Sequence, residues 1–225
     1  MNEMDKIKAS YIKGYLKKHH IECELANKDL DLLEEDDYNK LDEIGRIYNL
    51  KLYYFKDKED LARVKVVLGF LKNICPNTLL DVGSGRGVFL FPLLRDFPYT
   101  NVTSLDILER RIELLNYIKL GGIERLTPIQ ANICDVSFDD NSFDVVTLLE
   151  VLEHIPDVKK AIQNAIRIAK NYIVVTVPSK EDDNPEHIHL LTKDILTSMF
   201  HDCGVTNLKF GGVNGHLFLV AKKGR

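Results

Sequence analysis

Apolar and polar positions follow two different patterns along the chain, and the change lies near residue 60. Before it, apolar side chains recur every three to four residues, as Met4, Ile7 and Tyr11 do, which is typical of amphipathic helices. The pattern predicts a first helix here, a second over 38–47 and a third over 60–74. No segment of the first 60 residues has a convincing strand pattern, so we expect a helical start.

Short apolar runs begin at residue 78 and alternate with helical patterns. Runs that are apolar on both faces predict buried strands of a mainly parallel sheet, whose right-handed crossovers place helices on both sides. The expected strands are 78–82, 101–105, 127–131, 144–149 and 172–177. The expected helices between them are 88–96, 109–120 and 158–169.

The C-terminal part departs from this alternation. A helical pattern over 192–202 leads to an apolar run at 205–210, a glycine-rich turn at 211–215 and another apolar run at 216–221. Two strands joined by such a turn predict an antiparallel hairpin. The fold class is therefore α/β: a seven-stranded, mostly parallel sheet with a C-terminal antiparallel hairpin, helices on both faces and an N-terminal helical extension. We expect the extension, or lid, to cover residues 1–60 and the α/β domain to cover 61–225.

Composition limits the class of protein. Among the 225 residues, 45% are hydrophobic and 28% are charged, which is enough apolar material for a sizeable core. The formal net charge of −4 argues against nucleic acid as the main partner, because phosphate binding needs concentrated Lys and Arg. The four cysteines lack zinc-ligand spacing, and the chain shows neither a signal-peptide pattern nor an apolar run of roughly 20 residues. We therefore expect a cytoplasmic protein with reduced thiols and no membrane partner.

A glycine-rich turn is the strongest chemical signal. The run Asp81-Val82-Gly83-Ser84-Gly85-Arg86-Gly87 follows an apolar strand and opens a helical pattern. Glycines allow a tight turn and a close approach of the backbone to a ligand, and the helix N-terminus favours an anionic group. Val88 stands where the dinucleotide fingerprint needs its last glycine, and we find no hydride-transfer constellation. The turn therefore indicates a bound ligand and argues against a dehydrogenase.

Asp106 supplies the second signal. It ends the next apolar run and lies 19 residues after Gly87, close to the spacing at which an acid meets the ribose hydroxyls of a nucleoside. A carboxylate accepts two hydrogen bonds from a vicinal diol, which selects a ribose. A helix N-cap before Glu109 is the alternative role for this Asp.

Four segments together resemble the class I S-adenosylmethionine-dependent methyltransferase family, of the type 11-like kind. They are LLDVGSGRG (79–87), TSLDI (103–107), ANICDVSFDDNSFDVVTLLEVLEHI (131–155) and YIVVTVPS (172–179). The resemblance covers residues 78 to about 222 and keeps the family's order of motifs. It implies a Rossmann-like fold, an enzyme that transfers a methyl group, and S-adenosyl-L-methionine as cofactor.

The resemblance also implies a set of cofactor-binding residues. The residues that it places around the methionine part of the cofactor are Asp81, Gly83, Gly85 and Gly87, and it places Glu150 beside the cofactor. Asp106 corresponds to the residue that binds the ribose hydroxyls, and Ile107 lies against the adenine. Asn132 stands where the family commonly has an acid for the adenine amino group, and its amide oxygen can still accept that hydrogen bond. Ile133 would face the adenine ring with its N–H group.

Glu150-Val-Leu-Glu153-His154 leaves the fourth expected strand, on the edge where open parallel sheets bind ligands. Some family members that methylate RNA 2′-hydroxyls or polyphenols have a similar ExxEH run that holds a divalent metal. Such a site needs a further ligand, which His187 or His189 could supply. A similar run of residues also occurs in metal-free family members, and we expect no metal here. The candidates for a general base are then His154, Glu153 and His187.

The sequence does not identify the methyl acceptor. We expect a small molecule or a peptide, bound by a monomer or homodimer. An RNA methyltransferase, with metal-assisted 2′-O-methylation through Glu150, Glu153 and His154, is the alternative, and a non-catalytic nucleotide-binding module is a further one. We also expect Tyr11 and Tyr15, with neighbouring Lys and His residues, to lie over the acceptor pocket as part of a lid.

Overall fold

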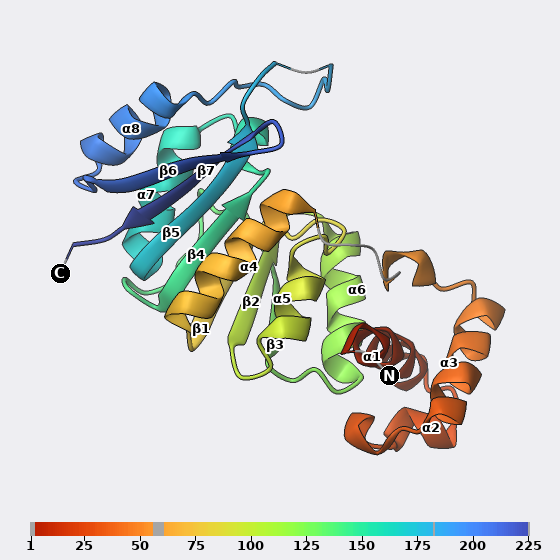
Figure 1. The fold of residues 1–225 in the computed structure, drawn as a ribbon. Coiled ribbons are helices and arrows are strands. Elements are labelled where there is room, and N and C mark those ends of the chain that lie inside the picture. Colours follow the sequence, from red (N-terminus) through yellow and green to blue (C-terminus); the bar gives the residue numbers. More distant parts are fainter. Residues whose placement is uncertain (1–2, 56–60, 182, 225) are drawn as a thin grey trace.

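Seven strands form one sheet in the computed structural model, which describes residues 3–55, 61–181 and 183–224 (Figure 1). Their order across the sheet is β3-β2-β1-β4-β5-β7-β6. The bounds are β1 Thr78–Val82, β2 Asn101–Asp106, β3 Leu126–Gln130, β4 Phe143–Leu149, β5 Ala169–Pro178, β6 Asn207–Val213 and β7 His216–Lys222. Strands β1 to β5 pair in parallel, whereas β7 runs antiparallel to both β5 and β6. The predicted sheet and its C-terminal hairpin are confirmed.

Helices cover both faces of this sheet, as the doubly apolar strands require. One face packs against α4 (Ala62–Ile74), α5 (Leu90–Asp96) and α6 (Glu109–Leu120), and the other against α7 (Val158–Ile168) and α8 (Lys193–Asp202). Successive strand residues divide between the two cores: Leu79 and Val145 belong to the first, Leu80 and Val146 to the second. All four side chains are fully buried.

The N-terminal extension is helical, as expected, and lies beyond α6 at one end of the molecule (Figure 1). It consists of α1 Glu3–Lys18, α2 Glu24–Asn27, η1 Leu30–Leu32, α3 Glu35–Ile47 and η2 Leu52–Phe55. Its apolar side chains join the hydrophobic core of the α4–α5–α6 face, so the extension is packed as part of the domain. The proposed boundary between residues 60 and 61 stays a prediction, because residues 56–60 lie outside the described residues.

Helices α1 and α6 touch through their backbones at two glycines. A Cβ atom on Gly14 would lie 1.7 Å from the carbonyl oxygen of Tyr117, and a Cβ on Gly121 would lie 1.7 Å from that of Ser10. Both distances are far below any contact that a side chain allows, so only glycine permits this approach. The extension is therefore fixed to the outer flank of α6.

The two tyrosines expected over the acceptor pocket pack against α6. Tyr11 and Tyr15 pack against Tyr117 of α6, with ring centroids 6.0 and 5.6 Å apart. Neither of them lines the two cavities at the strand ends that are described below. The apolar stripe of α1 is used to bind α6, which leaves the carboxyl ends of the strands uncovered by α1. In the part of the chain that the structure describes, no helix is long and apolar enough to cross a membrane.

Candidate functional site

The carboxyl ends of β1, β2, β4 and β5 meet at one edge of the sheet. The strand order reverses direction between β1 and β4, and open α/β sheets bind ligands at such a switch point. Two adjoining cavities lie there. The glycine-turn cavity measures about 180 Å³ and is bordered by the loop after β1, and the Asp106 cavity measures about 250 Å³ and is bordered by the ends of β2 and β4. Gly83 and Glu150 line both cavities, so the two form one continuous cleft.

The three glycines of the turn have different surroundings. All three have positive φ values, of 69° for Gly83, 54° for Gly85 and 78° for Gly87. A Cβ atom on Gly83 would lie 2.5 Å from Val151, and one on Gly87 would lie 2.4 Å from the ring of Phe91. A Cβ on Gly85 would meet only the Gly83 carbonyl oxygen, at 3.7 Å, so a side chain there would stand in the cavity. Gly85 is therefore the glycine that keeps space for a ligand, whereas Gly87 makes room for Phe91.

Asp81 is a buried carboxylate at the floor of the glycine-turn cavity. The hydroxyl groups of Ser84 and Thr147 donate hydrogen bonds to its two oxygens, at 2.6 and 2.8 Å. The pKa of Asp81 is raised to about 6: burial is the main cause, the two hydroxyl donors partly oppose the shift, and the charge of Asp106 adds to it. Asp81 is consequently ionised at neutral pH, but it is poised to bind a proton under mildly acidic conditions.

Asp106 ties the glycine turn to the end of β2. Its carboxylate accepts a hydrogen bond from the N–H of Gly85 at 3.0 Å and another from the N–H of Leu108 at 2.9 Å. The second bond is close to the capping role that was the alternative expectation, since Leu108 is the N-cap residue of α6. Each carboxylate oxygen keeps a further lone pair, and Asp106 lines its cavity beside Ile107. Capping and ribose binding are thus compatible.

Asn132 and Ile133 line the Asp106 cavity together with Ile107. The amide oxygen of Asn132 accepts a hydrogen bond from the N–H of Cys134 at 2.9 Å, and this bond holds the turn after β3. Ile133 is 3% exposed, whereas Ile107 is 65% exposed. The cavity therefore combines apolar side chains with an amide group, which suits a flat heterocycle with polar edges.

Glu150 stands at the junction of the two cavities in a strained backbone conformation. Its φ is +58°, in the left-handed region that disfavours residues other than glycine. Its carboxylate accepts a hydrogen bond from the Thr176 hydroxyl at 2.7 Å, and its other oxygen lies 2.9 Å from Nε2 of His216. Arg63 of α4 approaches the same carboxylate at 4.0 Å. The carboxylate is thus held over the cleft by three separate elements.

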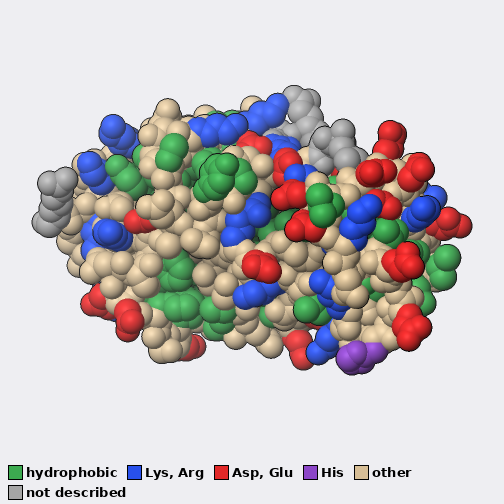
Figure 2. Space-filling view, turned by 90° about the horizontal axis from the view of Figure 1, so that it is seen from below, with side chains coloured by type: hydrophobic (Ala, Val, Ile, Leu, Met, Phe, Trp, Pro, Cys, Tyr) green, Lys and Arg blue, Asp and Glu red, His purple; other side chains and the backbone are tan. Residues whose placement is uncertain are grey.

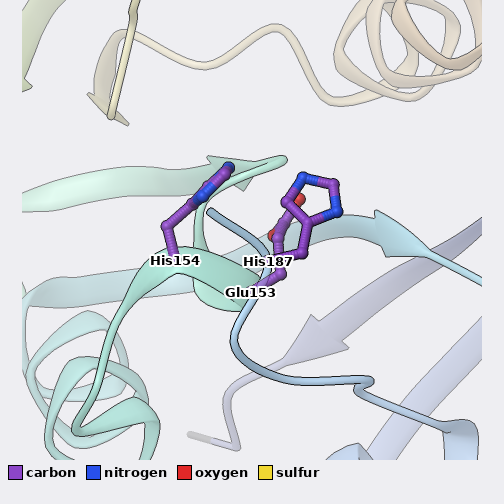
Figure 3. Close-up of side chains that lie close together, drawn as sticks. All are labelled: Glu153, His154 and His187. Carbon is purple, nitrogen blue, oxygen red and sulfur yellow. The ribbon is translucent and has the colours of Figure 1, made fainter. Parts of the chain in front are cut away.

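Glu153, His154 and His187 form a second group at this edge (Figure 3). One ligand-type atom of each lies within 4.8 Å of the others, and the two imidazole rings are 4.8 Å apart between centroids. Glu153 is fully buried in η3 (Leu152–His154), while His154 is exposed and lines the Asp106 cavity. Nδ1 of His154 lies 2.9 Å from the carbonyl oxygen of Glu186, which can only accept. In the neutral ring Nδ1 therefore carries the proton, and Nε2 offers its lone pair.

The three residues expected as candidates for a base are thus brought together, and His189 is not part of the group. Nε2 of His189 lies 3.1 Å from the carbonyl oxygen of Ile155, so this ring holds the loop in place. A carboxylate and two imidazoles could also supply ligands to a transition metal such as zinc or manganese. The geometry is therefore compatible with both roles that the ExxEH motif suggested.

Sequence reasoning missed Arg63, Thr176 and His216. Thr176 could have been found, because it lies near the carboxyl end of an expected strand, at the edge where ligands bind. His216 begins an antiparallel strand, and its register partner is Pro178 at the end of β5. An antiparallel strand begins at the edge where its parallel neighbours end, so the hairpin prediction implied this position. Arg63 carries no local signal, since it is one charge on an amphipathic helix.

The fold is similar to that of class I, Rossmann-like methyltransferases. Residues 80–173 match the model of the family described as methyltransferase domain. This segment contains Asp106, Asn132 and the Glu150–His154 run, so the residues around the cleft lie within the part of the chain that resembles this family.

The chain is also similar to individual proteins. The chain is 30% identical over 109 residues to a ubiquinone biosynthesis O-methyltransferase of Vibrio cholerae, covering 48% of this chain and 44% of that protein. It is 35% identical over 139 residues to an uncharacterized protein of Methanocaldococcus jannaschii, covering 61% and 56%. The chain spans about half the length of the curated relatives that it matches. Among solved structures, magnesium protoporphyrin IX methyltransferase from Synechocystis with bound S-adenosylmethionine has a TM-score of 0.55 at 17% identity, covering 72% of this chain and 78% of that one.

Proposed function

We propose that this chain is an S-adenosylmethionine-dependent methyltransferase that acts on a small-molecule acceptor, with a hydroxyl group as the acceptor atom. The observation that carries the proposal is the continuous cleft around Gly83 and Glu150, with Asp106 at one end and the glycine turn at the other. The similarity to proteins named ubiquinone biosynthesis O-methyltransferase supports a small molecule and an oxygen acceptor.

The residues of the cleft fit the parts of this cofactor. Asp106 would bind the ribose hydroxyls, and the adenine would lie between Ile107 and Ile133 with its edge at Asn132. The methionine part would occupy the glycine-turn cavity, where Gly85 leaves the space. Arg63 lines the same cavity and is a cation that could bind the methionine carboxylate.

A carboxylate at Glu150 would favour the methionine ammonium group by charge. Thr176 and His216 hold that carboxylate in place, which reduces the entropy lost when the ligand binds. The cofactor would supply a methyl group already activated by a sulfonium, so the protein needs no nucleophile of its own. Its task is to hold the acceptor in line and to remove water.

A hydroxyl acceptor must also lose its proton, and His154 is the residue placed to take it. Its Nε2 carries the lone pair because Nδ1 is held by the Glu186 carbonyl. The buried carboxylate of Glu153 and the ring of His187 lie beside it, so the charge that forms on His154 would have an anion close by. Glu153 and His187 would then act as residues that position His154 and stabilise its charged form.

The same three residues support a second candidate, a methyltransferase assisted by a divalent metal. The ligand atoms of Glu153, His154 and His187 are close enough for one ion to reach them all. We favour the metal-free mechanism, and chelation separates the two candidates.

An RNA acceptor gains no support from the structure. Three lysines of α1 are engaged within the protein: Lys6 pairs with Asp31, Lys8 pairs with Asp42, and the buried Lys13 donates to the carbonyl of Lys28. Acidic side chains also gather at the end of the molecule that the N-terminal helices form (Figure 2). This end would repel a phosphate backbone.

The test combines binding and transfer. Calorimetry should show S-adenosylhomocysteine binding in the micromolar range and no binding of NAD. His154→Ala should leave this affinity unchanged and lower kcat for a hydroxyl acceptor by about 100-fold or more, the usual contribution of a general base. Tight NAD binding without a response to S-adenosylhomocysteine would refute the proposed function. Unchanged kcat in His154→Ala would refute only the assignment of the base.

A further inference from the structure

A third cavity, of about 280 Å³, lies between the N-terminal extension, the glycine turn and α6. We refer to it as the basic cavity. Four cationic residues line it: Lys51, Arg86, Arg110 and Arg111. It lies outside the cleft that fits the cofactor, and neither the family motifs nor the proposed mechanism uses Lys51, Arg110 or Arg111.

The charge of this cavity is opposite to that of the chain as a whole, which is −4. Glu113 is the one acid that lines it, and its carboxylate accepts a hydrogen bond from the Tyr117 hydroxyl at 2.8 Å. Within the described ranges 3–55, 61–181 and 183–224, Lys51, Arg86 and Arg110 form no ion pair with a carboxylate. Four cations against a single carboxylate produce a positive potential in a concave surface, and this favours an anion.

Arg111 is held in place by a neighbouring side chain and is partly buried, unlike a mobile charge on an open surface. Its guanidinium donates to the hydroxyl of Tyr54 at 3.1 Å and lies 5.8 Å from the centre of that ring. Its Nε is buried, and no acceptor reaches it among the residues that the structure describes. A buried donor without an acceptor is costly in a folded protein and is common where a ligand completes the bond.

Aromatic side chains form the rest of the wall. Tyr11, Tyr54 and Tyr117 line the basic cavity and come from α1, η2 and α6. The rings of Tyr11 and Tyr117 are in contact, with centroids 6.0 Å apart. The extension therefore contributes to a binding surface here, although it does not cover the strand ends.

Arg86 connects the basic cavity to the cofactor cleft. It belongs to the glycine turn and lines both the basic cavity and the glycine-turn cavity. A molecule held in the basic cavity would thus lie against the loop that borders the methionine part of the cofactor.

We propose that the basic cavity binds an oxyanion group, a phosphate or a carboxylate, that is carried by the methyl acceptor. The proposal rests on the proposed function and narrows it to acceptors that bear an acidic group on an aromatic or otherwise apolar frame. The planar guanidinium group of arginine matches the geometry of both oxyanions, and the tyrosine rings can pack against the apolar part of the acceptor. The extension then selects the acceptor by charge, from the flank of α6.

The first experiment measures the binding of phenyl phosphate, benzoate and phenol to the full chain saturated with S-adenosylhomocysteine, at constant ionic strength. The two anions should bind and phenol should not. The double variant Lys51→Gln/Arg110→Gln should weaken both anions by about tenfold or more, as expected when hydrogen bonds to charged groups are lost. The matched control Lys119→Gln/Lys170→Gln removes the same charge outside the cavity and should bind like the wild type. Equal binding of phenol, or an equal loss in the control, would overturn the proposal.

Two further measurements separate the sources of the anion. Phenyl phosphate should bind more tightly than inorganic phosphate, because an acceptor brings its frame as well as its charge. Equal affinities would assign the cavity to a free anion and overturn the acceptor assignment. The affinity for S-adenosylhomocysteine should not change in Lys51→Gln/Arg110→Gln. A lower affinity in this variant would indicate that the cavity binds the carboxylate of the cofactor instead of the acceptor. A wild-type protein that fails to bind S-adenosylhomocysteine would refute the proposed function, whereas one that binds it but no aromatic anion would refute this inference alone.

Discussion

Nε2 of His216 lies 2.9 Å from Oε2 of Glu150 and joins the C-terminal hairpin to the junction of the two cavities. The contact holds a carboxylate whose backbone, at φ +58°, would by itself favour glycine. Conformational strain of this kind persists where side-chain contacts compensate for it, and it is common at functional sites.

His216→Ala should therefore weaken S-adenosylhomocysteine binding, by about three- to tenfold, because Glu150 loses one of the groups that orient it. His216→Gln keeps a side-chain N–H donor and should restore part of the affinity. His201→Ala removes an exposed imidazole on α8 and serves as the control. Calorimetry gives all three values, and an unchanged affinity in His216→Ala would show that Glu150 is held without the hairpin.

Asp106→Ala should lower the affinity for S-adenosylhomocysteine by about 1.5–3 kcal/mol, the usual value for hydrogen bonds to a charged group. Asp144→Ala is a matched control, because Asp144 also accepts two backbone N–H groups, those of Asn77 and Thr78, away from the cleft. Both variants should lose thermal stability, but only Asp106→Ala should lose cofactor affinity. A similar loss of cofactor affinity in both variants would show that Asp106 has only the structural role of capping the backbone.

Asp81 should make the stability of the ligand-free protein depend on pH between about 4 and 6. Its pKa is raised from 3.8 to about 6 in the folded chain, so in this range the folded state holds a proton that the unfolded state has released. Stability from this group is therefore highest near pH 4, falls as the pH rises to about 6 and is constant above it. Denaturant titrations of Asp81→Asn should show a more positive slope of unfolding free energy against pH than the wild type. The exposed Asp139→Asn should not change that slope.

Methyl transfer should persist after dialysis against EDTA, since we favour the metal-free role of Glu153, His154 and His187. The readout is transfer from labelled S-adenosylmethionine before and after chelation. Activity that disappears and returns with manganese or magnesium would establish the metal-assisted candidate. His189→Ala is the control for either mechanism, because this ring bonds to the Ile155 carbonyl and lies outside the cluster.

Gly14→Ala should destabilise the protein by more than about 2 kcal/mol, because the new methyl group would overlap the backbone of Tyr117 and force α1 away from α6. Gly69→Ala in α4 is the matched control, since a Cβ there meets no atom within 4 Å. In an exposed helix interior this change should be neutral or should stabilise by up to about 1 kcal/mol. Thermal unfolding of the two variants tests the prediction, and equal melting temperatures would contradict the close helix contact.

Much of the sheet could be predicted because its strands are apolar on both faces and its helices are periodic. The expected strand 78–82 and helix 109–120 agree with β1 and α6 at both ends. The strand at 127–131 is displaced by one residue, because Leu126 extends the pairing with β2 and the chain turns away after Gln130. Periodicity defines which residues are buried more sharply than it defines where hydrogen bonding stops.

The site could be predicted only where the chain itself brings residues together. Asp106 and the glycine turn follow adjacent strands, so their proximity follows from topology, and Glu153 and His154 are neighbours in sequence. The partner of α1 could not be predicted in this way, because an apolar stripe indicates that a helix is buried but does not identify the element that it packs against. The basic cavity depends on that partner, since Tyr11 and Lys51 meet Arg110 only after α1 has packed on α6.

The contact between α1 and α6 also has a consequence for how the chain is made. His19 and Tyr117 are 98 positions apart, and Lys17 and Leu120 are 103 positions apart, yet each pair is hydrogen-bonded. A ribosome therefore releases α1 long before its binding surface on α6 exists, and closing so long a loop is slow. During that interval the apolar stripe of α1 lacks its native partner, so this surface stays exposed until α6 has been synthesised.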